Sequence, residues 1–117
     1  MDLIEHEKAC KERFGEPHTE VHVFLDSYSW KYKGQSHRRI LHHELGAKLC
    51  EARFGEVAGM AARLHIEQDL GLVPGDWTGY EEHFFPLGDE EERQREDLLR
   101  IYGEETVERI EGKKEWG

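Results

Sequence analysis

Apolar residues recur at helical spacing along most of this chain, and glycines interrupt them every few turns. Stretches with apolar side chains at i, i+3 and i+4 end at Gly15, Gly55 and Gly71. Such spacing places these side chains on one face of an α-helix, and a glycine just beyond the last turn is a common helix end. No stretch alternates apolar and polar residues as a half-buried strand does. The pattern predicts an all-α fold.

Six helices are expected, and between the fourth and fifth lies a segment rich in glycine, proline and aromatic residues. That segment, residues 72–88, is expected to be irregular and to pack onto the helices through Trp77, Tyr80, Phe84 and Phe85. The helices are expected at about residues 2–14, 19–28, 36–54, 56–70, 89–102 and 104–111, with N-caps at Thr19, Ser36 and Asp89. The prediction is a compact helical bundle of about four core helices. Residues 1–88 form a histidine-rich helical domain, and residues 89–117 form an acidic helical C-terminal extension of it.

The charge of the chain narrows the choice of partners. Its formal net charge is −10, and the last part, residues 88–117, has 11 acidic and 6 basic residues. Such a surface repels nucleic acid and anionic membranes, which argues against both as main partners. No stretch approaches the ~20 apolar residues of a membrane span, and the acidic beginning does not resemble a signal peptide. A cytoplasmic protein with Cys10 and Cys50 as free thiols is expected.

Histidines give the strongest indication of a site, because all eight precede Phe84. Two of them open the same pattern, since Asp26 follows His22 by four residues and Asp69 follows His65 by four. Residues at i and i+4 share one face of a helix. Both pairs are expected at the border of a buried stripe, where a semi-buried ligand set would lie. The two stripes are Val21, Phe24, Leu25 and Tyr28 in the second helix and Val57, Met60, Ala61 and Leu64 in the fourth.

The expected third helix adds two adjacent histidines, His42 and His43, on its apolar side, with His37 at its polar edge. A buried imidazole must satisfy both an N–H and a lone pair, so these rings need partners. The carboxylates of Asp26 and Asp69, or a metal ion, would supply them. The sequence therefore predicts that His22, His65 and either His42 or His43 converge on one site, with His37 as a further candidate.

Imidazole nitrogen and carboxylate oxygen together suit Zn²⁺, Fe²⁺, Mn²⁺ or Ni²⁺. Three protein ligands would leave a position for water, whose lowered pKa makes a nucleophile near neutral pH. Asp26 and Asp69 would act as further ligands, as general bases, or as hydrogen-bond partners that orient the imidazoles. The prediction is a divalent-metal-binding helical protein, with metal-dependent hydrolysis of an unidentified small-molecule substrate as its candidate activity.

Two other functions fit the same residues. One is a non-enzymatic interaction or regulatory protein, in which the histidines and aspartates form a structural polar core and the acidic tail mediates assembly. The mixed apolar and polar C-terminal helices are compatible with a homodimer. The other is a metal-free enzyme that uses a His–Asp dyad as a general base, although no Ser, Cys or Lys is placed as its nucleophile. A single His-x-x-x-Asp pair can also be only a surface contact of about 0.2–0.5 kcal/mol.

Several of these motifs resemble those of a small uncharacterised family found in bacteria, archaea and phages. The run Ser36-His37-Arg38-Arg39-Ile40-Leu41-His42-His43 is similar to its R-H-R-A-L-x-H-H motif. His6 precedes Phe14-Gly15 as in its H-x7-F-G, residues 22–26 are similar to its H-D-W-L-D, and residues 65–77 to its H-V-x-E-D-L-G-x-I-P-x-x-D-W. The resemblance covers about residues 6–77. It departs at Ser36, where Arg is usual, at Ser29, where Lys is usual, and in the acidic tail. The family has no established activity, so the resemblance implies a residue set and leaves the reaction open.

Overall fold

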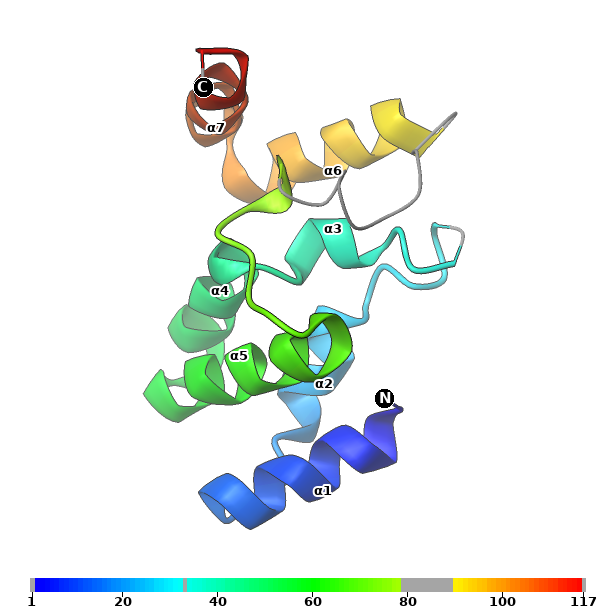
Figure 1. The fold of residues 1–117 in the computed structure, drawn as a ribbon, viewed down its shortest axis with the longest axis vertical. Helices are drawn as coiled ribbons and strands as arrows, with labels where there is room; N and C mark the ends of the chain where they lie inside the picture. The colour runs from blue at the N-terminus through cyan, green and yellow to red at the C-terminus, as the bar shows by residue number, and fades with distance from the viewer. Residues whose placement is uncertain (1, 33, 79–89, 117) are drawn as a thin grey trace.

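Seven helices follow one another in residues 2–32, 34–78 and 90–116, the parts of the chain that this computed structural model describes. They are α1 (Leu3–Phe14), α2 (Thr19–Leu25), α3 (Arg38–Leu41), α4 (Glu44–Phe54), α5 (Glu56–Leu70), α6 (Glu91–Tyr102) and α7 (Glu104–Trp116). Figure 1 shows α1 at one end of the molecule, α6 and α7 at the other, and α2 to α5 between them. These residues contain no strand, so the predicted all-α class is confirmed.

The first two helices are joined by a short turn that follows Gly15. Asp2 caps α1 by accepting a hydrogen bond from the Glu5 amide, and Gly15 ends the helix with φ of +85°. His18, with φ of +51°, is the N-cap of α2, whereas Thr19 was expected there. The helix also ends at Leu25, so Tyr28 lies in the turns that follow. Asp26 is therefore the residue at the C-terminal end of α2.

Small residues bring α4 and α5 together along most of their length, which makes this pair the centre of the core. A Cβ on Gly59 would lie 2.9 Å from the Glu51 Cβ, so the two backbones approach closely. The buried face of α5 consists of Ala58, Gly59, Ala61, Ala62, His65 and Ile66. The expected stripe is wrong at Val57 and Met60, which are 46% and 50% exposed. The close approach to α4 selects the alanine and glycine side instead.

The expected third helix is broken into α3 and α4 at His42 and His43. His43 has an extended backbone and caps α4, because its Nδ1 accepts a hydrogen bond from the Gly46 amide at 3.4 Å. Gly46 packs on the end of α3, where an added Cβ would lie 1.7 Å from the Leu41 carbonyl oxygen. The prediction of one long helix from Ser36 is therefore wrong. The break points the two histidine side chains in different directions.

The predicted packing of the aromatic segment is confirmed at Trp77, which is fully buried. Its ring stacks on Tyr102 of α6 and meets the edge of His43, with centroid distances of 5.5 and 5.9 Å. The Tyr102 hydroxyl donates a hydrogen bond of 2.7 Å to the Ile40 carbonyl in α3. These contacts join the aromatic segment, the α3–α4 break and α6. The other residues for which a role was expected, Tyr80, Phe84, Phe85 and Asp89, lie outside the described residues, as does His83.

A buried carboxylate also anchors the acidic C-terminal part. Asp97 of α6 is 1% exposed, lies 2.8 Å from Lys31 Nζ and 2.7 Å from Arg100 Nη2, and accepts a hydrogen bond from the Tyr32 hydroxyl. The α7 helix continues to Trp116, beyond the expected end at residue 111, and buries Val107. None of the helices in the described ranges has the length and apolar character that a membrane span requires.

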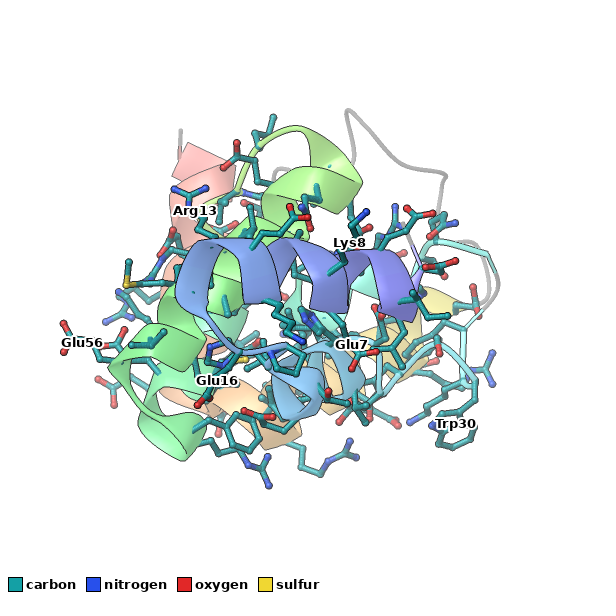
Figure 2. The ribbon with its side chains drawn as sticks, turned by 90° about the horizontal axis from the view of Figure 1, so that it is seen from below. Glu7, Lys8, Arg13, Glu16, Trp30 and Glu56 are labelled. Carbon is teal, nitrogen blue, oxygen red and sulfur yellow. The ribbon has the colours of Figure 1, made fainter. Side chains whose placement is uncertain are left out.

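Charged side chains cover the face of the molecule formed by α1. Figure 2 shows Lys8 and Arg13 on α1, and Trp30 projecting from the turn after α2. Trp30 is 83% exposed. The polar core that α1 covers from this side contains His6 and the histidines of α2 and α5.

Candidate metal centre

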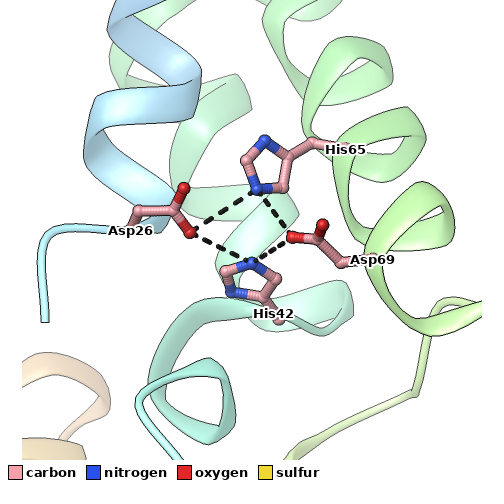
Figure 3. A group of neighbouring side chains, drawn as sticks. All are labelled: Asp26, His42, His65 and Asp69. Atoms are coloured by element: carbon pink, nitrogen blue, oxygen red, sulfur yellow. Dashed lines mark hydrogen bonds and ion pairs between the residues drawn. The ribbon is translucent and has the colours of Figure 1, made fainter. Parts of the chain in front are cut away.

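Two histidines and two aspartates meet where α2, the α3–α4 break and α5 come together. Asp26 ends α2, His42 lies in the break, and His65 and Asp69 are one turn apart on α5. Each of the four offers one nitrogen or oxygen atom, and these four atoms lie within 4.8 Å of one another. Figure 3 shows the four side chains converging from three directions. The described residues therefore contain a His/Asp cluster of the type that can hold a metal ion.

The cluster alternates nitrogen and oxygen atoms at nearly equal spacing. His42 Nε2 lies 3.2 Å from Asp69 Oδ2 and 3.4 Å from Asp26 Oδ1, and His65 Nε2 lies 3.1 and 3.6 Å from the same two oxygens. A tetrahedral zinc ion with bonds of about 2.0–2.1 Å would hold its ligand atoms about 3.3 Å apart. The four N···O spacings fit that edge length. The donor set also fits, since two imidazoles and two carboxylates are ordinary zinc ligands.

The nitrogen of His65 that faces the cluster has a distinctive environment. His65 Nε2 is buried and, among the described residues, makes no contact with the alignment of a hydrogen bond. Two carboxylate oxygens nevertheless lie within 3.6 Å of it. The ring therefore directs this atom between the oxygens and not at either one. An ion at the centre of the four atoms would lie in that direction.

Burial differs sharply around the cluster. The side chains of His42, His65 and Asp69 are at most 2% exposed, whereas that of Asp26 is 41% exposed. Solvent thus reaches the cluster from the Asp26 side. An ion bound there would be enclosed by three buried ligands and covered by one accessible carboxylate.

Further side chains hold Asp69 in place. Its Oδ1 accepts a hydrogen bond of 3.2 Å from His6 Nε2 and lies 3.6 Å from Arg38 Nη2, which leaves Oδ2 to face the cluster. His6 Nδ1 lies 2.9 Å from the Gln68 side-chain oxygen. The His6 ring also stacks on the His65 ring, with centroids 3.7 Å apart. These contacts orient one carboxylate and one imidazole at once.

The charges of the cluster favour ionised carboxylates. Burial alone would raise the pKa values of Asp26 and Asp69, but contacts from the surrounding histidines hold both pKa values well below the ordinary range. Burial lowers the pKa of His42 to about 4 and outweighs the nearby carboxylates. Burial also opposes protonation of His65, but Asp26 and Asp69 raise its pKa. Two carboxylates, that of Asp69 buried and that of Asp26 partly exposed, therefore face two imidazoles, and a divalent cation would balance their negative charge.

The remaining predicted ligands lie around the cluster and not in it. His22 Nε2 is 2.9 Å from the Pro17 carbonyl oxygen, and its Nδ1 is 2.9 Å from His65 Nδ1, on the side of that ring away from the cluster. His37 Nε2 lies 3.7 Å from Asp26 Oδ1. The structure brings His42 to the cluster and directs His43 away from it. His43 Nε2 donates to the Arg39 carbonyl, at 3.1 Å.

Sequence reasoning overlooked the contribution of His6, Gln68 and Arg38. His6 and Cys10 lie one turn apart on the buried side of α1, a spacing that is compatible with a thiolate–imidazole pair but more typical of a small buried side chain at the cysteine. The burial of Cys10 raises the pKa of its thiol to about 11, which does not favour a thiolate. The H-x7-F-G resemblance was the one sequence signal that marked His6.

A half-open cavity of about 370 Å³ lies apart from the cluster, lined by Phe24, Tyr28, Leu41, Leu49, Ala52, Arg53 and Ile101.

Comparisons with protein-family models, with curated proteins and with solved structures found no match to this chain. The resemblance to the uncharacterised family therefore stays a prediction. The chemistry of the site rests on the geometry of the cluster.

Proposed function

We propose that this protein binds one divalent transition-metal ion, with zinc preferred, through His42, His65, Asp26 and Asp69. The observation that carries the proposal is the set of four N···O spacings between 3.1 and 3.6 Å, which agree with four of the six edges of a tetrahedral zinc site. The surroundings support it as well. His6 and Arg38 hold the far oxygen of Asp69, as outer residues commonly do around metal ligands.

The coordination number bears on what the ion does. Four protein ligands complete a tetrahedron, which is typical of zinc sites that stabilise a fold, whereas catalytic sites keep a position for water. We therefore propose stabilisation of the helical core as the first role of the ion. Hydrolysis is the second candidate, and the exposure of Asp26 favours it. If that carboxylate yields its place, water can bind the ion from the solvent side.

Elemental analysis of the untagged protein, before and after chelation, tests metal binding. We expect one zinc ion per chain after reconstitution and less than about a tenth of that in His65→Ala, because the variant loses a buried ligand. His18→Asn is a matched control, since His18 lies outside the cluster and Asn tolerates its positive φ. Absence of metal from the reconstituted wild-type protein, or full occupancy in His65→Ala, would overturn the proposal.

Replacement of zinc by Co²⁺ distinguishes the two roles. A closed site gives the absorption of four-coordinate cobalt and does not change on addition of azide. A site with an exchangeable position binds azide and shifts toward five-coordinate absorption. Asp26→Ala should open the position artificially and provides the positive control.

A further inference from the structure

The His22 ring forms a hydrogen-bonded link between the backbone and His65. It is 1% exposed, with Nε2 2.9 Å from the Pro17 carbonyl oxygen and Nδ1 2.9 Å from His65 Nδ1. A carbonyl oxygen can only accept, so the hydrogen of this first contact belongs to His22 Nε2. The two ring nitrogens of His22 contact a carbonyl oxygen and another imidazole and not a carboxylate, so burial favours the neutral ring. A neutral imidazole protonated on Nε2 has its lone pair on Nδ1.

That lone pair determines the state of His65. Two ring nitrogens 2.9 Å apart need one hydrogen between them, and His22 Nδ1 can only accept it. His65 Nδ1 must therefore donate. In the neutral His65 ring, the lone pair then lies on Nε2, the atom that faces Asp26 and Asp69. A lone pair directed at two carboxylate oxygens is repulsive, and a metal ion between the three atoms would remove that repulsion.

We propose that His22 is a positioning residue: together with the Pro17 carbonyl it fixes His65 as the Nδ1–H tautomer and makes Nε2 the metal-binding atom. This inference rests on the proposed metal site and assigns His22 a role outside the ligand set. Metal-binding histidines generally donate their second N–H to an acceptor that sets tautomer and ring orientation. Here the His22 imidazole is that acceptor, and the Pro17 carbonyl in turn determines which nitrogen of His22 carries the hydrogen.

Two conservative variants separate this role from packing. In His22→Asn the amide oxygen lies near the Nδ1 position and can still accept from His65, but the contact with Pro17 is lost. In His22→Gln the longer amide reaches the Nε2 position and keeps the Pro17 contact, but the acceptor for His65 is lost. We expect a zinc dissociation constant within about threefold of wild type for His22→Asn and about 10–100-fold weaker for His22→Gln. Equal affinities in wild type and His22→Gln would overturn the assignment.

Nitrogen NMR of the histidine rings gives a second readout that a purely structural role would not move. Long-range ¹H–¹⁵N spectra of the metal-free protein at about pH 8.5, two units above the ordinary histidine pKa, should show His65 protonated on Nδ1 and His22 on Nε2. Zinc should then perturb Nε2 of His65 and leave its Nδ1–H in place. A neutral His65 protonated on Nε2, or zinc bound at Nδ1, would overturn the inference.

The two proposals can fail separately. Wild-type protein that takes up no metal would overturn the metal site, while the metal-free spectrum would still decide the His65 tautomer. Zinc binding by a His65 ring of the opposite tautomer would retain the metal site and remove the role of His22.

Discussion

Gly46 packs directly against the Leu41 carbonyl oxygen, and this contact separates two adjacent histidines into different surroundings. A Cβ at position 46 would lie 1.7 Å from that oxygen, so only glycine allows α4 to begin where it does. His42 consequently faces Asp26 and Asp69, whereas His43 caps α4 and packs against Trp77. The position of one candidate ligand therefore depends on a residue with no side chain.

Gly46→Ala should destabilise the protein by about 3 kcal/mol or more, because the methyl group meets a fixed backbone carbonyl and the α3–α4 break must move. Urea unfolding of the metal-free protein measures the change. Gly75→Ala is the matched control, since a Cβ at that position has no neighbour within 4 Å. A Gly46→Ala variant as stable as Gly75→Ala would show that the break is not held by this contact.

Zinc should stabilise the wild-type protein, by about 2.7 kcal/mol when free zinc is 100 times the dissociation constant. Asp69→Asn should abolish most of this gain, because the variant lacks one of the two charges that balance the ion. Asp97→Asn changes another buried carboxylate, which is paired with Lys31 and Arg100 away from the cluster. It should lower stability yet keep the zinc-dependent shift in melting temperature. Loss of the shift in both variants would contradict a specific role for Asp69.

Mild acid should destabilise the metal-free protein through two of its buried histidines. Burial lowers the pKa values of His22 and His43 from 6.5 to about 4. Between these values His22 and His43 bind more protons in the unfolded chain than in the folded one, so their contribution to stability is complete above about pH 6.5 and falls as the pH drops toward 4. His43→Asn keeps an N-cap acceptor and removes one of these titrations. Urea unfolding in chelator should show a shallower fall for this variant, and an unchanged slope would contradict the prediction.

Tyr102→Phe should cost about 1 kcal/mol, because the Ile40 carbonyl loses the donor of a 2.7 Å hydrogen bond in a partly buried position. Tyr28→Phe is the comparison, since the Tyr28 hydroxyl accepts its bond from Arg100 in an exposed position. We expect a change of less than about 0.5 kcal/mol there. Urea unfolding of both variants tests whether the Tyr102 contact holds α6 on α3, and equal losses would contradict it.

Much of the fold follows from local sequence signals. Helical spacing and the glycines at positions 15 and 71 predicted α1 and α5 to within a residue or two. The break before α4 was missed because helical spacing continues through His42 and His43. Its cause, the contact of Gly46 with Leu41, appears only in three dimensions. The same limitation explains the error at Val57 and Met60, where close packing of α4 on α5 selects the face with smaller residues.

The cluster was anticipated only in part, for a related reason. The i, i+4 spacing of His65 and Asp69 lies within one helix, and the structure keeps this pair together. The corresponding spacing of His22 and Asp26 spans the end of α2, and the His22 ring turns to Pro17 and His65. The spacing of residues along the sequence cannot reveal that the His22 ring turns away from Asp26. It also gives no indication that His6 of α1 would contact Asp69 of α5.

The four side chains of the cluster come from widely separated points of the chain. Asp26 and His42 are 16 positions apart in sequence, and His42 and His65 are 23 apart. An ion shared among them closes two loops, and closing a loop of about 15 residues in the unfolded chain costs about 3 kcal/mol in the chain-entropy treatment. Folding has already brought the four ligands together, so the ion binds the folded chain in preference to the unfolded one and stabilises it by mass action. Only His65 and Asp69 are near neighbours before folding. A metal ion captured early would therefore bind first to these two residues on nascent α5, and Asp26 and His42 would join it as the fold forms.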